Sequence, residues 1–164
     1  MAAVDELRFV TVSQHDPLAA PLLAELAVEY AFRYGSTEQR VMKWLLEEYP
    51  AEDFTPPAGA LLIGLLDGVP ITGGAFRRFD DTRAELKRIW TDSSHRQRGY
   101  AKAVLGELER EIALRGYRHV YLTTGDRQPE AEALYLSSGY TRLDGPLPTV
   151  GESYPIAFEK TLGL

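Results

Sequence analysis

The stretch Arg88–Ala101, which reads RIWTDSSHRQRGYA, decides the fold that this sequence predicts. It begins as the end of a strand, continues as a short polar loop, and opens a helix at Gly99. The first N–H groups of a helix have no partner inside the helix, and the helix dipole adds positive potential there. A pyrophosphate fits such a place, because glycine lets a ligand approach the backbone closely. A solvated, well-capped helix start explains the same residues, and the turn alone leaves both readings open.

Other phosphate-binding loops are missing from the sequence. It contains no G-x-x-x-x-G-K-[ST] pattern and no G-x-G-x-x-G pattern after a strand. Gly73-Gly74 lies inside an expected strand, where glycines indicate a bulge or kink rather than a phosphate site. Any phosphate site is therefore expected at Gly99.

Hydrophobic periodicity on both sides of this stretch predicts a single domain over residues 1–164 with alternating helices and strands. The order indicates an α/β (α+β) fold, with helices on the faces of a mixed sheet. Ser36 or Thr37 is expected to cap the second helix, and Asp67-Gly68 is a strong hairpin signal. We expect strands over 7–12, 60–66, 69–79, 82–91, 119–124, 140–143 and 154–162, and helices over 18–34, about 37–46, 99–115 and 129–138.

Composition excludes several classes of protein. Of 164 residues, 45% are hydrophobic and none is cysteine, so disulfides and thiolate chemistry are excluded. His15, His95 and His119 lie far apart in sequence, so we expect no metal. A net charge of −6 disfavours a nucleic-acid partner and is compatible with a cationic small molecule. With no apolar run of membrane length and no visible secretory signal, we expect no membrane partner and a cytoplasmic location.

Several segments, in order and correctly spaced from about residue 60 onward, carry a family resemblance. Arg96–Ala101 matches the pattern [QR]-x-x-G-x-[GA] of the GNAT N-acetyltransferase superfamily. The remaining segments resemble a common bacterial subgroup of that superfamily: Ala84–Thr91 (AELKRIWT), Leu122–Gly125 (LTTG), Gln128–Ala131 (QPEA), Leu134–Tyr135, Ser138–Tyr140 and Phe158–Leu162.

The resemblance implies a splayed mixed sheet of about seven strands with helices on both faces, and acetyl-coenzyme A as co-substrate. The cofactor would lie where the fourth and fifth strands part, within a core spanning 84–140, while residues 1–55 would form the acceptor side. Backbone N–H groups of the turn would hold the pyrophosphate, and the strand before it would pair with the pantetheine arm. The cofactor residues so implied are Ile89, Trp90, Thr91, Arg96, Gln97, Arg98, Gly99, Tyr100, Ala101, Lys102 and Ala131.

The fourth strand carries an irregularity of its own. Leu86 and Ile89 are three residues apart, which strict alternation forbids on one face of a strand. A bulge near Lys87–Ile89 would reconcile them and free a backbone N–H for the thioester carbonyl. A strand buried on both faces, with no strict pattern, explains the spacing equally well.

Two residues are candidates for the chemistry. By resemblance, Tyr135 aligns with the tyrosine that serves many relatives as general acid toward the coenzyme A sulfur; core packing is its alternative role. Glu85 is a candidate base, or an anchor for the acceptor ammonium, and a surface pair with Lys87 or Arg83 explains it nearly as well.

The acceptor site is the least defined part. Relatives place it near the loop joining the first two helices, which implies Tyr30, Phe32, Arg33 and Tyr34 together with Glu85, and an aromatic cluster there could equally be core. The loop Leu143–Tyr154 is expected to cover the same site. Where many relatives carry Asn after the fifth strand, this chain has Thr124-Gly125-Asp126.

The resulting functional hypothesis is transfer of an acetyl group from acetyl-coenzyme A to a small-molecule amine or amino acid, by direct attack in a ternary complex. The alternatives are a non-catalytic coenzyme A-binding sensor or interaction module, and a protein or peptide N-acetyltransferase. Relatives are commonly dimeric, so a homodimer is a further expectation.

Overall fold

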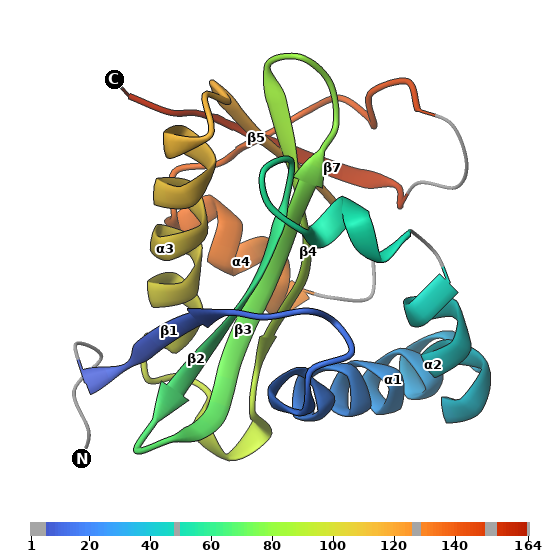
Figure 1. Ribbon diagram of the computed structural model, residues 1–164. Helices are drawn as coiled ribbons and strands as arrows, with labels where there is room; N and C mark the ends of the chain where they lie inside the picture. Colours follow the sequence, from blue (N-terminus) through green and yellow to red (C-terminus); the bar gives the residue numbers. More distant parts are fainter. Residues whose placement is uncertain (1–5, 48–49, 126–128, 150–153, 164) are drawn as a thin grey trace.

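The computed structural model describes residues 6–47, 50–125, 129–149 and 154–163, and its centre is one seven-stranded sheet (Figure 1). The strand order is β1-β2-β3-β4-β5-β7-β6, and every neighbouring pair is antiparallel except β4 and β5, which are parallel. The expected mixed sheet is confirmed. The strands are β1 (Arg8–Thr11), β2 (Ala60–Leu66), β3 (Val69–Arg78), β4 (Arg83–Thr91), β5 (His119–Thr124), β6 (Thr141–Arg142) and β7 (Ile156–Thr161).

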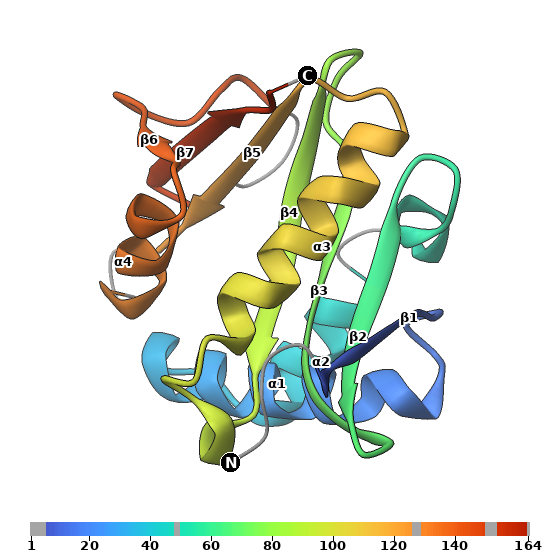
Figure 2. The ribbon, with the colours of Figure 1, turned by 90° about the vertical axis from the view of Figure 1, so that its left-hand side faces the viewer.

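Helices cover both faces of the sheet, as expected (Figure 2). On one face lie α1 (Ala20–Tyr34) and α2 (Glu38–Glu47), and on the other lie α3 (Tyr100–Leu114) and α4 (Pro129–Ser137). Short 3-10 turns that the sequence did not predict occur at η3 (Ala51–Phe54) and η4 (Ser93–His95), and a third, η2 (Pro17–Ala19), leads into α1. No helix in the described part of the chain is both long and apolar enough to cross a membrane.

Local sequence signals explain where the elements begin and end. Gly35 ends α1 in the left-handed conformation with φ 69°, which glycine adopts at little cost. Thr37 Oγ1 accepts a hydrogen bond from the Arg40 N–H at 3.2 Å and so caps α2. Asp67 and Gly68 both have positive φ, as a tight hairpin between β2 and β3 requires.

Two hydrophobic cores result, one on each face of the sheet. Val104, Leu105, Leu108 and Ile112 of α3 are fully buried against the sheet. Burial of each such side chain contributes about 1.5–3 kcal/mol. The second core lies under α1 and α2 and includes Trp90 of β4. β4 therefore contributes to both cores, because Leu86 of the same strand belongs to the first.

β4 separates from β5 after a short stretch of pairing. The two strands pair only over Arg83–Glu85 and His119–Tyr121, beyond which no pairing holds them together. On its other side β4 carries a bulge against β3, because Ala75 pairs with Lys87 and Gly73 pairs with Trp90. Two residues of β4 thus face one of β3, and Arg88 adopts φ 60°. This confirms the bulge that the spacing of Leu86 and Ile89 suggested.

Candidate active site

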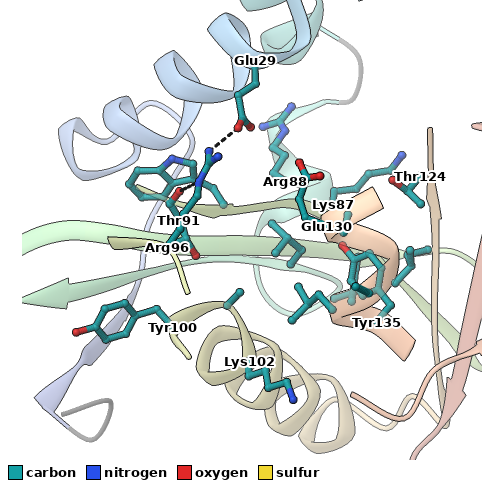
Figure 3. Close-up of a pocket in the computed structure, with 18 of the residues that line it drawn as sticks. Glu29, Lys87, Arg88, Thr91, Arg96, Tyr100, Lys102, Thr124, Glu130 and Tyr135 are labelled. Atoms are coloured by element: carbon teal, nitrogen blue, oxygen red, sulfur yellow. Dashed lines mark hydrogen bonds and ion pairs between the residues drawn. The ribbon is translucent and has the colours of Figure 1, made fainter. Parts of the chain in front are cut away.

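A cavity of about 810 Å³ occupies the opening between β4 and β5, a volume typical of small-molecule sites (Figure 3). It is bounded by the last residues of these strands, the start of α3, one side of α4 and the end of α1. Residues far apart in the sequence therefore meet where the sheet parts.

The turn before α3 presents unpaired backbone donors to this cavity. Gly99 has φ 84° and Gln97 has φ 62°, which directs the chain into the first turn of α3. In the described part of the chain, the backbone N–H groups from Gln97 to Ala101 donate no hydrogen bond. Gln97, Gly99, Tyr100 and Ala101 all line the cavity. A helix N-terminus with free amides at a cavity wall fits a phosphate group.

The loop that precedes the turn is held by its own side chains. Asp92 Oδ2 accepts hydrogen bonds from the Ser94 N–H at 3.2 Å and contacts His95 Nδ1 at 2.7 Å. The Ser94 hydroxyl and His95 together lower the pKa of Asp92 below its ordinary value. The carboxylate therefore stays charged and fixes the loop that leads into α3.

The basic side chains of the turn differ in their engagement. Arg96 forms ion pairs with Glu29 and Glu25 of α1 and donates from Nε to the Thr91 carbonyl oxygen at 3.3 Å. Lys102 lines the cavity, whereas Arg98 is exposed and does not line it. The ion pairs of Arg96 therefore connect α1 to the turn before α3.

The strand side of the cavity is formed by Ile89, Trp90 and Thr91. Thr72 Oγ1 donates to the Trp90 carbonyl oxygen at 2.7 Å and contacts Thr91 Oγ1 at 3.1 Å. The Trp90 ring itself is buried in the core under α1 and α2. These residues therefore present an anchored strand edge to the cavity.

Arg88, the residue with positive φ in the bulge, is tethered through its side chain. Its guanidinium is buried and donates from Nη1 to Gln14 Oε1 at 2.8 Å and from Nη2 to the Leu45 carbonyl oxygen in α2. The same group lies 4.7 Å from the centre of the Phe54 ring. The geometry of the bulge is thus tied to α2 and to the segment before α1 that carries Gln14.

Tyr135 projects from α4 toward the cavity, which it lines together with Ala131 and Leu134 (Figure 3). Its ring packs 5.7 Å from the rings of both Tyr140 and Phe158, measured between centroids. Burial, and secondarily the neighbouring Tyr30, raises the pKa of the Tyr135 phenol well above its ordinary value. The hydroxyl therefore remains protonated at neutral pH.

Glu85 is buried beside the cavity but is not part of its lining. Its carboxylate pairs with Arg77 Nη1 at 3.1 Å and with Lys87 Nζ at 3.5 Å. Of its two suggested ion-pair partners, Lys87 is the one found, since Arg83 pairs with Asp80 and Glu159. Lys87 does line the cavity.

The structure divides the expected acceptor residues. Tyr30 and Arg33 line the main cavity, and Arg33 forms an ion pair with Glu130 that joins the end of α1 to the start of α4. Phe32 is 90% exposed and lies outside the lining. Tyr34 instead lines a smaller adjacent cavity.

Gly125 follows β5 where many relatives carry a side chain, and here the Tyr34 ring lies close to it. A Cβ added at Gly125 would lie 2.0 Å from Tyr34 Oη, so the lack of a side chain at 125 makes room for the tyrosine. Asp126 and residues 150–153 of the expected covering loop lie outside the described residues. Tyr154, at the end of that loop, lines both cavities.

Several lining residues were not expected from the sequence. The bulge was the signal for Lys87 and Arg88, and the segments that carry the family resemblance contain several others without assigning them a role. The residues concerned are Glu29, Leu86, Lys87, Arg88, His95, Leu122, Thr123, Thr124, Glu130, Ala133, Leu134 and Ser137.

Two known N-acetyltransferases resemble part of the chain in sequence. Over 81 residues the chain is 32% identical to human N-acetyltransferase 8, covering 49% of this chain and 34% of that protein. It is 35% identical over 81 residues to the uncharacterized N-acetyltransferase YsnE of Bacillus subtilis, covering 48% and 53%. The chain thus spans about half or less of the length of these relatives.

A solved structure extends the likeness to the whole fold. The PaiA N-acetyltransferase of Thermoplasma acidophilum, solved in complex with coenzyme A, superposes with a TM-score of 0.73 over 95% of this chain and 99% of that chain, at 16% identity. Residues 21–140 match the acetyltransferase (GNAT) family model, and the chain belongs to that family.

Proposed function

We propose that this protein transfers an acetyl group from acetyl-coenzyme A to a primary amine of a small molecule. The observation that carries the proposal is the row of free backbone amides from Gln97 to Ala101 beside the opening between β4 and β5. The family and the coenzyme A held by the Thermoplasma neighbour point to the same ligand.

The residues present fit this ligand. The amides at the start of α3 would hold the pyrophosphate, with Lys102 adding positive charge, and Ala131 leaves room on α4 for the rest of the molecule. Ile89, Trp90 and Thr91 would offer the backbone edge of β4 to the amide groups of the pantetheine arm. Residues 84–140 would thus bind the co-substrate, and residues 1–55 would contribute most of the acceptor side.

When bound, acetyl-coenzyme A supplies an activated acetyl group as a thioester. The bulge at Arg88 would aim backbone N–H groups at the carbonyl oxygen, where negative charge develops. Tyr135 would donate its proton toward the departing sulfur, because burial keeps its phenol protonated. An amine held on the α1 and α2 side would attack directly, forming the C–N bond as the C–S bond breaks, and the proton that its nitrogen loses would restore the Tyr135 phenol by way of solvent.

The acceptor must be neutral when it attacks. Glu85 does not line the cavity, so we propose an indirect role in which its carboxylate fixes the Lys87 ammonium at the wall. Lys87, with the buried guanidinium of Arg88 behind it, would lower the pKa of an acceptor ammonium. Glu85 is then a positioning residue.

Calorimetry with acetyl-coenzyme A tests the binding site directly. Gly99→Glu places a side chain and a negative charge where φ is 84°, and we expect no measurable affinity. Gly106→Glu is the matched control, because it adds the same charge at an open position of the same helix. Normal affinity in Gly99→Glu would contradict the placement of the ligand.

A thiol-release assay over a panel of amines separates transfer from mere binding. Release of coenzyme A that depends on an added amine is the expected result. Tight binding without turnover on any amine would indicate a sensor, and turnover on peptides alone would indicate a protein N-acetyltransferase.

A further inference from the structure

The end of α1 and the start of α2 enclose a second cavity of about 330 Å³. Its size is at the small end of ligand sites, enough for one ring system. Tyr30 and Tyr154 line both this cavity and the main one, so the two are adjacent and meet at these side chains. The second cavity is lined by Tyr30, Tyr34, Ser36, Arg40, Val41, Trp44 and Tyr154.

Aromatic rings form most of this wall. The Tyr30 and Tyr34 rings meet edge to face at 6.0 Å between centroids, and the Tyr34 and Tyr154 rings lie 6.3 Å apart. Trp44 remains 38% exposed although it belongs to a helix with a buried face. Such rings offer a large contact area to a flat apolar group, by stacking or edge-to-face packing.

Arg40 is the charged residue among the described residues that line the second cavity. Arg40 is exposed, and its guanidinium forms no ion pair within the described chain. Among the residues that the structure describes, no acidic one lines this cavity, although Glu29 and Glu130 line the main one. Those two carboxylates are already paired, with Arg96 and Arg33. Among the described lining residues, a cationic group would therefore find no counter-charge in the second cavity, whereas a carboxylate would find Arg40.

We infer that the acceptor is an amine that carries both a flat apolar group and a carboxylate, as an aromatic amino acid does. Its ring occupies the second cavity, its carboxylate faces Arg40, and its amine points through the junction at Tyr30 and Tyr154 into the main cavity. This inference rests on the proposed acetyl transfer and names its substrate class.

The kinetic test compares amines that differ in one group. With thiol release as the readout, we expect kcat/KM to be highest for phenylalanine or tryptophan. It should be lower for phenethylamine and tryptamine, which lack the carboxylate, and for alanine, which lacks the ring. Lysine and spermidine should be poor acceptors.

Variants of the second cavity sharpen the test. Trp44→Ala should raise the KM for the aromatic acid about tenfold, as expected for one lost aromatic contact, with the KM for acetyl-coenzyme A unchanged. Arg40→Gln should reduce the preference for phenylalanine over phenethylamine up to about fivefold, as for an exposed charge pair. Lys43→Gln and Leu114→Ala are matched controls, exposed and outside both cavities.

Binding can be followed without turnover through Trp44 fluorescence. Aromatic acids should quench it, and the quench should disappear in Trp44→Phe, which retains only Trp90. Efficient acetylation of aliphatic amines, with no effect of Trp44→Ala, would overturn this inference and leave the proposed function intact. If no amine is acetylated, a quench by aromatic acids still supports the site, and its absence overturns it.

Discussion

Replacing Arg88 tests whether the bulge in β4 is fixed by its side-chain contacts with Gln14 and α2. Arg88→Ala removes the guanidinium that donates hydrogen bonds to Gln14 Oε1 and to the Leu45 carbonyl oxygen. Gln14 and Leu45 are both buried. Each buried acceptor left without a donor costs about 1–3 kcal/mol, so the two together predict a loss of about 2–6 kcal/mol.

Arg88→Gly separates the backbone contribution from that of the side chain. At φ 60° a residue with a Cβ is strained by about 1–2 kcal/mol, and glycine is not. Arg88→Gly should therefore unfold at a higher urea concentration than Arg88→Ala, by the equivalent of about 1 kcal/mol. Urea titration followed by tryptophan fluorescence measures both.

The effect on activity should be the same in the two variants, because both lose the tether. If the tether aims the bulge amides at the carbonyl oxygen, kcat should fall at least about tenfold, toward the 10²–10³ that a lost oxyanion donor costs. The KM for acetyl-coenzyme A should not change, because the turn at Gly99 is untouched. A destabilised Arg88→Ala variant with wild-type kcat would refute the reasoning.

Three further predictions concern other parts of the molecule. Tyr135→Phe should lower kcat about 10²-fold or more without changing cofactor affinity, and unchanged turnover in this variant would remove the phenol from the mechanism. Because burial raises the pKa of Tyr135, turnover of the wild type should show no loss from phenol ionisation below about pH 10. Gly125→Ala should displace the Tyr34 ring, because the added Cβ would lie 2.0 Å from Tyr34 Oη. The KM for the acceptor should rise several-fold, while calorimetry shows normal cofactor binding. An unchanged acceptor KM would contradict the placement of Tyr34 in the acceptor site. Burial opposes ionisation of Asp80, but hydrogen bonds from Thr82 and Arg83 outweigh burial and lower the pKa of Asp80 below 3.8. The stability that the Asp80 carboxylate contributes is therefore present above pH 3.8 and is lost as pH falls through the folded-state pKa. Urea midpoints at pH 7 and pH 3 should differ less in Asp80→Asn than in wild type, and an equal difference would be evidence against this account.

Local patterns in the sequence predicted the elements that frame the site. The stripe of apolar residues in α3 and the Asp67-Gly68 hairpin have local causes, and both were found as expected. The spacing of Leu86 and Ile89 indicated the bulge, because side-chain alternation in a strand is strict enough to make an exception informative.

The fine structure of the site could not be read in the same way. Arg88 reaches Gln14 and Leu45, which are 74 and 43 positions away in sequence, and no local pattern encodes such a pairing. Glu85 could be placed on β4, yet whether its carboxylate faced a ligand or a cation depended on Arg77 of the neighbouring strand. Long-range partners decide such roles.

The brief pairing of β4 with β5 gives this protein two sheet edges in its interior. Unpaired strand edges carry a row of backbone donors and acceptors, which at the surface invite association with other chains. At the outer margins β1 has four residues and β6 has two, so little edge is offered there. An extended ligand that lies between the unpaired edges of β4 and β5 would connect the two halves of the sheet and restrict their relative motion. Amide hydrogens of Ile89–Thr91 and Leu122–Thr124 should report that stiffening as slower exchange with deuterium.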